Sequence, residues 1–113
     1  MIISIQFIKG INEETIPTIR LTRSRDGSTA TAIFNFEQPS ILTKSFFFKK
    51  QITGLYLIDN LNILSTNDLH VRFINGKPYS IEAIFVFKTN ETYERFLKFM
   101  QNYASKNSLS FKR

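Results

Sequence analysis

The stretch that decides the fold is residues 69–87, LHVRFINGKPYSIEAIFVF, in which two alternating segments flank Asn75-Gly76. Asn-Gly favours a two-residue type I′ hairpin turn, because both central residues of that turn need positive φ angles. The returning segment places every second residue on one face, and that face is apolar. Its residues are Tyr79, Ile81, Ala83, Phe85 and Phe87. The stretch therefore predicts an antiparallel sheet with one packed face.

Similar alternation predicts further strands along the chain, although one segment departs from it. Residues 52–59 are apolar on both faces, which is typical of an interior strand. Asp26-Gly27 is expected to turn the chain between two strands, and Pro39 to end a strand before a short helical turn over residues 39–44. The other expected strands are Ile2–Ile8, residues 18–24, residues 29–36 and the weaker residues 61–65.

One long helix is expected over Asn90–Ser105. Asn90 can cap it, and Glu91 and Glu94 lie in the first turn, where the helix dipole favours acidic side chains. An apolar stripe repeats at helical spacing. It consists of Tyr93, Phe96, Leu97, Met100 and Tyr103.

Together these elements predict an α+β fold: an antiparallel β-sheet built from hairpins, with one C-terminal α-helix packed on a face. A length of 113 residues fits a single domain over residues 1–113. The apolar face of each element supplies the expected core. Its members are Ile19, Leu21, Phe34, Phe36, Leu57, Phe73, Ile81, Phe85, Phe96 and Met100.

The residues offer little catalytic chemistry. The chain has no cysteine, and its four glycines are isolated, so neither a thiolate site nor a Gly-rich phosphate loop is expected. His70 is the only histidine, and the alternation places it toward solvent beside Arg72. Glu13-Glu14 is expected to be a solvated turn in preference to an acid–base pair. We therefore expect no catalytic residue, no metal ligand and no cofactor.

Charge and aromatic residues carry more information. The net charge is +6, and part of the excess lies in the loop before the interior strand, around Phe46, Phe47 and Phe48. Three consecutive Phe side chains cannot all face inward on a strand. An exposed Phe beside Lys44, Lys49 and Lys50 would suit an anionic membrane surface or an acidic protein surface. The alternatives are a solvated basic face and an irregular strand with two Phe side chains in the core.

A rival interpretation is a small single-strand nucleic-acid-binding module. In it, Phe34, Phe36 and Phe73 would stack on bases, with Arg20, Arg23 and Arg72 on phosphates. Stacking residues must be exposed, whereas the alternation makes the same Phe residues the expected core. No nucleic acid is therefore expected, and burial of Phe34, Phe36 and Phe85 would distinguish the two classes of binding protein.

Several blocks, taken in order, resemble the photosystem II reaction centre 13 kDa protein family, the small extrinsic Psb protein numbered twenty-eight in that series. The resemblance covers nearly the whole chain. The blocks are RLTRS (20–24), FEQPSIL (36–42), ITGLYLID (52–59), RFINGKP (72–78), ERFLKFM (94–100) and NSLSF (107–111).

The resemblance implies a photosystem II assembly factor that is not an enzyme and has no cofactor. Family members lie peripherally on the stromal side of the chloroplast (plastid) thylakoid membrane, or on its cytoplasmic side in cyanobacteria. They bind transiently to reaction-centre subunits in intermediates that contain the larger inner antenna chlorophyll protein. The family protein pairs its sheet with the C-terminal tail of that antenna protein and limits damage while the complex is unfinished.

Two site predictions follow from the resemblance. Strand addition needs an open sheet edge, and Thr18–Arg25 is favoured over Ile2–Ile8, because Arg20, Arg23 and Arg25 could hold an acidic tail. In the family an acid-rich loop stands where this chain has SFFFKK at 45–50. That departure predicts a contact of this loop with anionic thylakoid lipids or with an acidic partner loop.

Overall fold

The computed structural model describes residues 2–43, 52–60 and 62–109. Its strands form two antiparallel sheets, whereas the sequence predicted one. In the three-stranded sheet the order is β1 (Ile3–Gln6), β4 (Leu55–Asp59) and β5 (Asn62–Thr66). In the four-stranded sheet the order is β2 (Thr18–Arg23), β3 (Ala30–Glu37), β7 (Lys77–Phe87) and β6 (Leu69–Ile74). The helices are α1 (Ser40–Thr43) and α3 (Asn90–Lys106).

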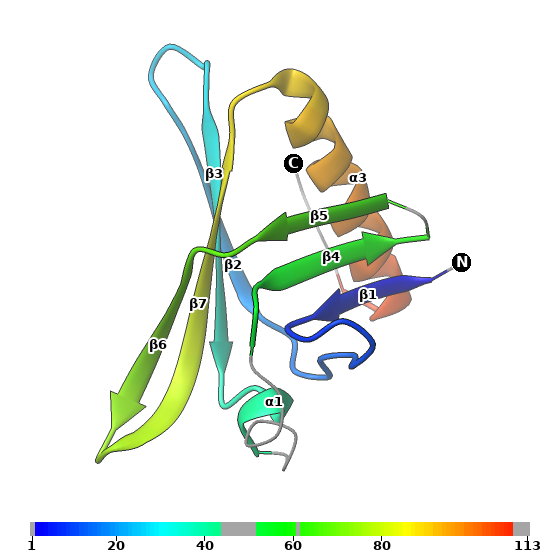
Figure 1. Cartoon of the computed structure of the whole chain (residues 1–113). Coiled ribbons are helices and arrows are strands. Elements are labelled where there is room, and N and C mark those ends of the chain that lie inside the picture. The colour runs from blue at the N-terminus through cyan, green and yellow to red at the C-terminus, as the bar shows by residue number, and fades with distance from the viewer. Residues whose placement is uncertain (1, 44–51, 61, 110–113) are drawn as a thin grey trace.

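The main helix closes the core against both sheets. It contacts β1 and β4 of the smaller sheet and β7 of the larger sheet (Figure 1). Phe96 of α3 lies edge-on to Phe34, with ring centroids 6.0 Å apart, and 4.8 Å from Phe87. From the smaller sheet's side, Phe7 meets Phe36 edge-on at 4.8 Å. The α+β class is therefore as predicted, and the C-terminal helix contacts two sheets where the sequence predicted one.

Large and small side chains alternate across the central strand pair. Along β3 and β7, Ala30 lies opposite Phe87, Ala32 opposite Phe85, and Phe34 opposite Ala83. All six side chains are buried. Each ring therefore has a methyl group across from it, which lets the two rows interdigitate at native density. A slip of two residues would place Phe34 opposite Phe85 in one direction and Ala32 opposite Ala83 in the other, so side-chain size favours the observed register.

A corner at residues 66–68 explains why there are two sheets. The Thr66 hydroxyl donates to the carbonyl oxygen of Ile84 at 2.7 Å, and the Ile84 N–H donates to the carbonyl of Asp68 at 3.0 Å. The chain therefore leaves β5 and joins β7 of the other sheet within three residues. Gly54 allows the tight approach here, because an added Cβ would lie 2.7 Å from the Thr66 carbonyl oxygen. The hydrophobic pattern contains no signal for this corner.

The decisive hairpin forms as predicted. β6 and β7 are joined by Asn75 and Gly76, whose φ angles are 53° and 78°. At the other end of β7, Thr89 and not Asn90 caps α3, since its side chain accepts a hydrogen bond from the Thr92 N–H. The prediction of Asn90 as the cap was wrong by one residue, within the usual uncertainty of helix ends.

Nine of the ten predicted core residues pack in or against the core. Seven are buried, and Ile19 and Leu21 of the edge strand β2 are partly buried against them. Phe73 is the exception, because 60% of its surface is exposed. The register shifts between Arg72 and Phe73, and the end of the β6–β7 hairpin projects beyond α3 and the smaller sheet (Figure 1). The alternation correctly predicted a strand, but none of the described helices and strands covers its tip.

Truncation of two Phe residues tests this arrangement. Phe85→Ala should lower the free energy of unfolding by about 3–5 kcal/mol, because it leaves a cavity opposite Ala32. Phe73→Ala should lower it by less than about 1 kcal/mol, because the ring is already in water. Denaturant unfolding measures both. A loss below about 1 kcal/mol for Phe85→Ala would show that the wrong face has been placed inward.

Candidate functional site

Open sheet edges are the first candidate for binding a partner. Among the described strands, β2 and β6 border the larger sheet, and β1 and β5 border the smaller one. Both predicted segments, Thr18–Arg25 and Ile2–Ile8, therefore contain an edge strand. An edge offers a row of main-chain N–H and C=O groups to an incoming extended peptide.

The hydrogen bonds show which groups of β2 are open. The Ser24 N–H donates to the Thr29 carbonyl at 3.0 Å, in register with the β2–β3 ladder. Because antiparallel pairs alternate, the main chain of Thr22 points toward β3. A proline at Thr22 would therefore disrupt the β2–β3 pairing and would not block the open edge. The residues of β2 whose main-chain groups point outward are Ile19, Leu21 and Arg23.

The predicted arginines do not form one cluster. Arg20 lines the outer face of the larger sheet. Arg23 lies on the opposite face, with its guanidinium carbon 5.0 Å from the centroid of the Tyr93 ring, and it donates to the Gly27 carbonyl at 3.3 Å. Arg25 is exposed in the following turn. A peptide added to β2 would meet Arg20 on one of its faces and Arg23 on the other.

The second edge of the larger sheet is less polar. The hydrogen bond from Ile84 N–H to the Asp68 carbonyl sets the alternation on β6, so the main-chain groups of Leu69 and Val71 point outward. Val71 is 42% exposed. The sequence did not single out this edge, although its apolar alternation is the same signal that predicted the hairpin.

A groove of about 610 Å³ crosses the outer face of the larger sheet. One row of side chains spans all four strands, because Thr18 lies opposite Asn35, Asn35 opposite Glu82, and Glu82 opposite His70. His70 is exposed, as predicted, and its Nε2 lies 2.8 Å from Asp68 Oδ1. The polar residues that alternate with the core positions could have revealed this groove from sequence.

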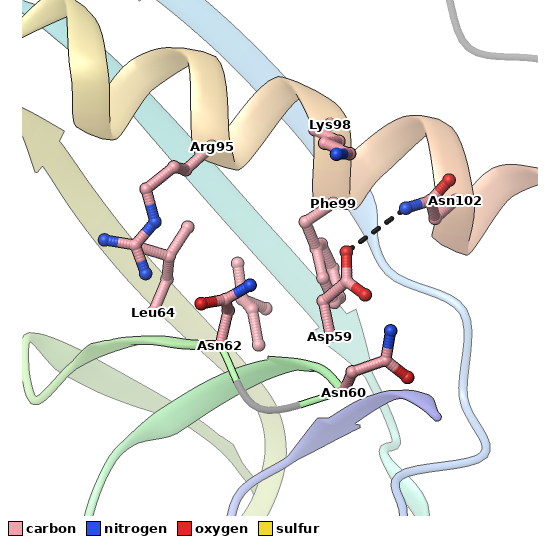
Figure 2. Close-up of a pocket in the computed structure, with 9 residues that line it drawn as sticks. Asp59, Asn60, Asn62, Leu64, Arg95, Lys98, Phe99 and Asn102 are labelled. Atoms are coloured by element: carbon pink, nitrogen blue, oxygen red, sulfur yellow. Dashed lines mark hydrogen bonds between the residues drawn. The ribbon is translucent and has the colours of Figure 1, made fainter. Parts of the chain in front are cut away.

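A smaller cleft of about 220 Å³ lies between α3 and the β4–β5 turn. Figure 2 shows Arg95 and Asn102 projecting from the helix toward Asp59 and Asn62. Asn102 Nδ2 donates to Asp59 Oδ2 at 3.1 Å. This bond ties the helix to the smaller sheet, so we assign Asn102 and Asp59 a structural role.

Glu13 is buried, with 5% of its surface exposed, so the prediction that it belongs to a solvated turn was wrong. Its carboxylate accepts hydrogen bonds from the Ser40 N–H at 2.7 Å and hydroxyl at 2.8 Å, and from the Ile41 and Thr15 N–H groups at 3.0 Å. These bonds satisfy the first N–H groups of α1. No local sequence pattern predicts this contact, because it joins residues 27 positions apart.

The buried Glu13 charge also acts on Tyr103. Burial of the phenol, and secondly the negative charge of Glu13, raise the pKa of Tyr103 to about 12 from its ordinary value of 10.0. The folded protein therefore favours the protonated phenol. That contribution to stability is present below pH 10.0 and is lost as the pH rises from there toward 12.

The predicted aromatic and basic loop lies outside the described residues. Its residues are Lys44, Phe46, Phe47, Phe48, Lys49 and Lys50. Within residues 2–43, 52–60 and 62–109, no group of three or more His, Cys, Asp or Glu side chains could hold a metal ion. No described helix is long and apolar enough to cross a membrane.

The geometry thus defines a basic α+β protein with open sheet edges, and comparison with known proteins gives its family. The sequence profile described as "Psb28 protein" matches residues 5–111. The chain therefore belongs to the Psb28 family, a family of photosystem II proteins, as the resemblance predicted.

Its relatives match over nearly their full lengths. The chain is 53% identical over 108 residues to the "Photosystem II reaction center Psb28 protein" of Pyropia yezoensis, covering 96% of this chain and 94% of the relative. It is 50% identical over 111 residues to the protein of that name from Thalassiosira pseudonana, with 98% and 97% covered. For Cyanidioschyzon merolae the identity is 48% over 110 residues, with 97% of both chains covered.

Replacement of Glu13 tests its structural role. Glu13→Gln should lower the free energy of unfolding by about 2–3 kcal/mol. The amide NH₂ group of the new Gln side chain would face N–H and O–H donors that bond to the carboxylate in the parent protein. The substitution should also lower the pKa of Tyr103, although burial keeps that pKa above 10.0. Denaturant unfolding and tyrosinate absorbance measure the two effects. Glu37→Gln, at an exposed position, is the matched control and should change neither; equal behaviour of the two variants would contradict the assignment.

Proposed function

We propose that the protein is a non-enzymatic assembly factor of photosystem II. It binds transiently to reaction-centre intermediates that contain the larger inner antenna chlorophyll protein and protects them during biogenesis or repair. It works peripherally on the thylakoid membrane, at the stromal side in a plastid or the cytoplasmic side in a cyanobacterium. The observation that carries this proposal is family membership over residues 5–111, together with relatives named for the photosystem II reaction center.

The proposed mode of binding is strand addition by the C-terminal tail of the antenna protein to β2. Three observations support it. Alternate residues of β2 direct main-chain groups outward, and Arg20 and Arg23 flank that edge on opposite faces. The protein carries a net charge of +6, which favours an acidic segment. Main-chain hydrogen bonds would supply affinity, and the two arginines would select carboxylates through charge-assisted hydrogen bonds.

The loop that carries Lys44, Lys49 and Lys50 remains a second proposed contact. Its chemistry, three lysines beside Phe46–Phe48, suits anionic thylakoid lipids or an acidic partner loop. Because Glu13 anchors the start of α1, the described structure fixes where the chain enters this loop. The proposed contacts therefore depend on binding groups, namely arginine, lysine and main-chain amides, and require no chemical step.

The nucleic-acid alternative loses its stacking platform. Phe34 and Phe36 have no exposed surface, and Phe85 is 4% exposed. A buried ring cannot stack on a base. Of the three Phe residues that this alternative assigns to base stacking, only Phe73 is exposed, so they form no row of stacking rings.

A proline at an outward-facing amide tests the edge. Arg23→Pro removes one open N–H of β2 and leaves the β2–β3 hydrogen bonds in place, so the fold should survive. Arg23→Ala is the matched control, since it loses the same charge and keeps the N–H. Affinity for a synthetic antenna-tail peptide should fall about tenfold further for the proline variant, because it loses one hydrogen bond to the peptide.

Other outcomes would be decisive as well. Equal affinity of both variants would remove β2 from consideration, and a loss confined to Val71→Pro would place the tail on β6.

Co-purification from solubilised thylakoids tests the function itself. The tagged protein should appear with assembly intermediates, and recovery only with mature dimers, or with no photosystem subunit, would contradict it.

A further inference from the structure

The end of the β6–β7 hairpin exposes apolar surface that no described element covers. We call residues 72–77 the hairpin tip. Phe73 is 60% exposed and Ile74 is 42% exposed, and Val71 behind them is 42% exposed. Phe73 is the one aromatic side chain among the exposed large hydrophobic residues of the described part of the chain. Such a concentration in one projecting segment marks an interaction surface.

Positive charge accompanies these side chains. Arg72 precedes Phe73, and Lys77 follows the turn; both are exposed. No acidic residue occurs between Asp68 and Glu82, so the tip carries a local charge of +2 from these two side chains. Apolar side chains beside cations match the boundary between acyl chains and anionic headgroups.

The backbone of the tip suits that boundary. Asn75 and Gly76, with φ angles of 53° and 78°, make a two-residue turn in which Ile74 lies opposite Lys77. Opposite Phe73 stands Pro78, which has no N–H group to desolvate. Pro78 therefore adds no N–H donor that would lose a hydrogen bond when the tip enters an apolar environment.

The shape of the molecule leaves the tip accessible. In Figure 1 the hairpin extends away from α3 and the three-stranded sheet, and its turn is the outermost point of that arm. A projecting tip fits a soft, flat surface such as a bilayer, whereas a folded protein would need a matching pocket. A second copy of this chain is disfavoured, because each copy has a net charge of +6 and brings the same cations to the contact.

We propose that the hairpin tip docks on an anionic lipid bilayer. Phe73 and Ile74 enter the boundary between headgroups and acyl chains, and Arg72 and Lys77 bind lipid phosphates. This contact is independent of the tail-binding edge and of residues 44–50. It would orient the sheet relative to the membrane, so that a peptide emerging from the bilayer meets a fixed edge.

The absence of tryptophan gives a clean reporter. Phe73→Trp places a single fluorophore at the tip, and Val86→Trp places one at a residue of β7 that is 54% exposed. With vesicles of phosphatidylcholine and phosphatidylglycerol, the emission of the tip variant should shift to shorter wavelength. The emission of the Val86 variant should not shift. An unshifted tip variant, or equal shifts in both variants, would overturn the proposal.

Vesicle flotation separates the apolar and ionic parts. Phe73→Ser with Ile74→Ser should weaken binding at least about tenfold at low and high salt. Arg72→Gln with Lys77→Gln should weaken it about tenfold or more at low salt and little at high salt. The control, Ile63→Ser with Val86→Ser, removes comparably exposed apolar side chains and should bind like the parent protein.

Two results would overturn the proposal in flotation. One is binding of the tip variants that equals the parent's. The other is a parent protein that does not bind vesicles but forms dimers, when the serine substitutions abolish those dimers. That result would assign the tip to contact with a second copy of the chain. Peptide binding is measured without lipid. A negative result with vesicles therefore leaves the proposed function unchanged, and a negative result with the peptide leaves the proposed membrane contact unchanged.

Discussion

The interlock between β3 and β7 is the constraint on which the rest of the structure depends. Phe34 lies opposite Ala83, while Ala32 and Ala30 lie opposite Phe85 and Phe87, so each ring fills the space above a methyl group. This arrangement fixes the register and presents one continuous aromatic surface to α3 and the smaller sheet. It also commits these rings to the core, which excludes them from base stacking and leaves binding to the edges and the hairpin tip.

A rigid core keeps the sheet edges in a geometry that suits peptide binding. The Thr66–Ile84 hydrogen bond at the corner and the Glu13 carboxylate at α1 attach the peripheral segments to this core. Pairing with β3 along residues 18–23 holds the outward amides of β2 in strand geometry before a partner arrives, and preorganisation lowers the entropy lost on binding. The protein thus combines a packed sheet with main-chain and arginine groups at its border, which suits the reversible peptide binding proposed above.

The sequence predicted most of the fold, since period-two alternation, Asn75-Gly76 and the helical stripe are local signals. It failed where contacts join distant segments. The burial of Glu13 depends on Ser40, and the two sheets arise from the corner at Thr66. Phe73 is exposed because no element in the described part of the chain covers it. For the site, basic residues near an edge could be predicted. The division of Arg20 and Arg23 between two faces of β2 follows from the alternation, because the residues are three positions apart. Which main-chain groups of β2 point outward required the observed pairing with β3.

The central claim is that the outward main chain of β2 binds an extended peptide. Amide hydrogen exchange with and without a synthetic antenna-tail peptide tests it most directly. Exchange at Ile19, Leu21 and Arg23 should slow on binding, while Arg20 and Thr22, already bonded to β3, should change little. Protection at Leu69 and Val71 in place of β2, or unchanged exchange along every strand when the peptide is bound, would contradict the account.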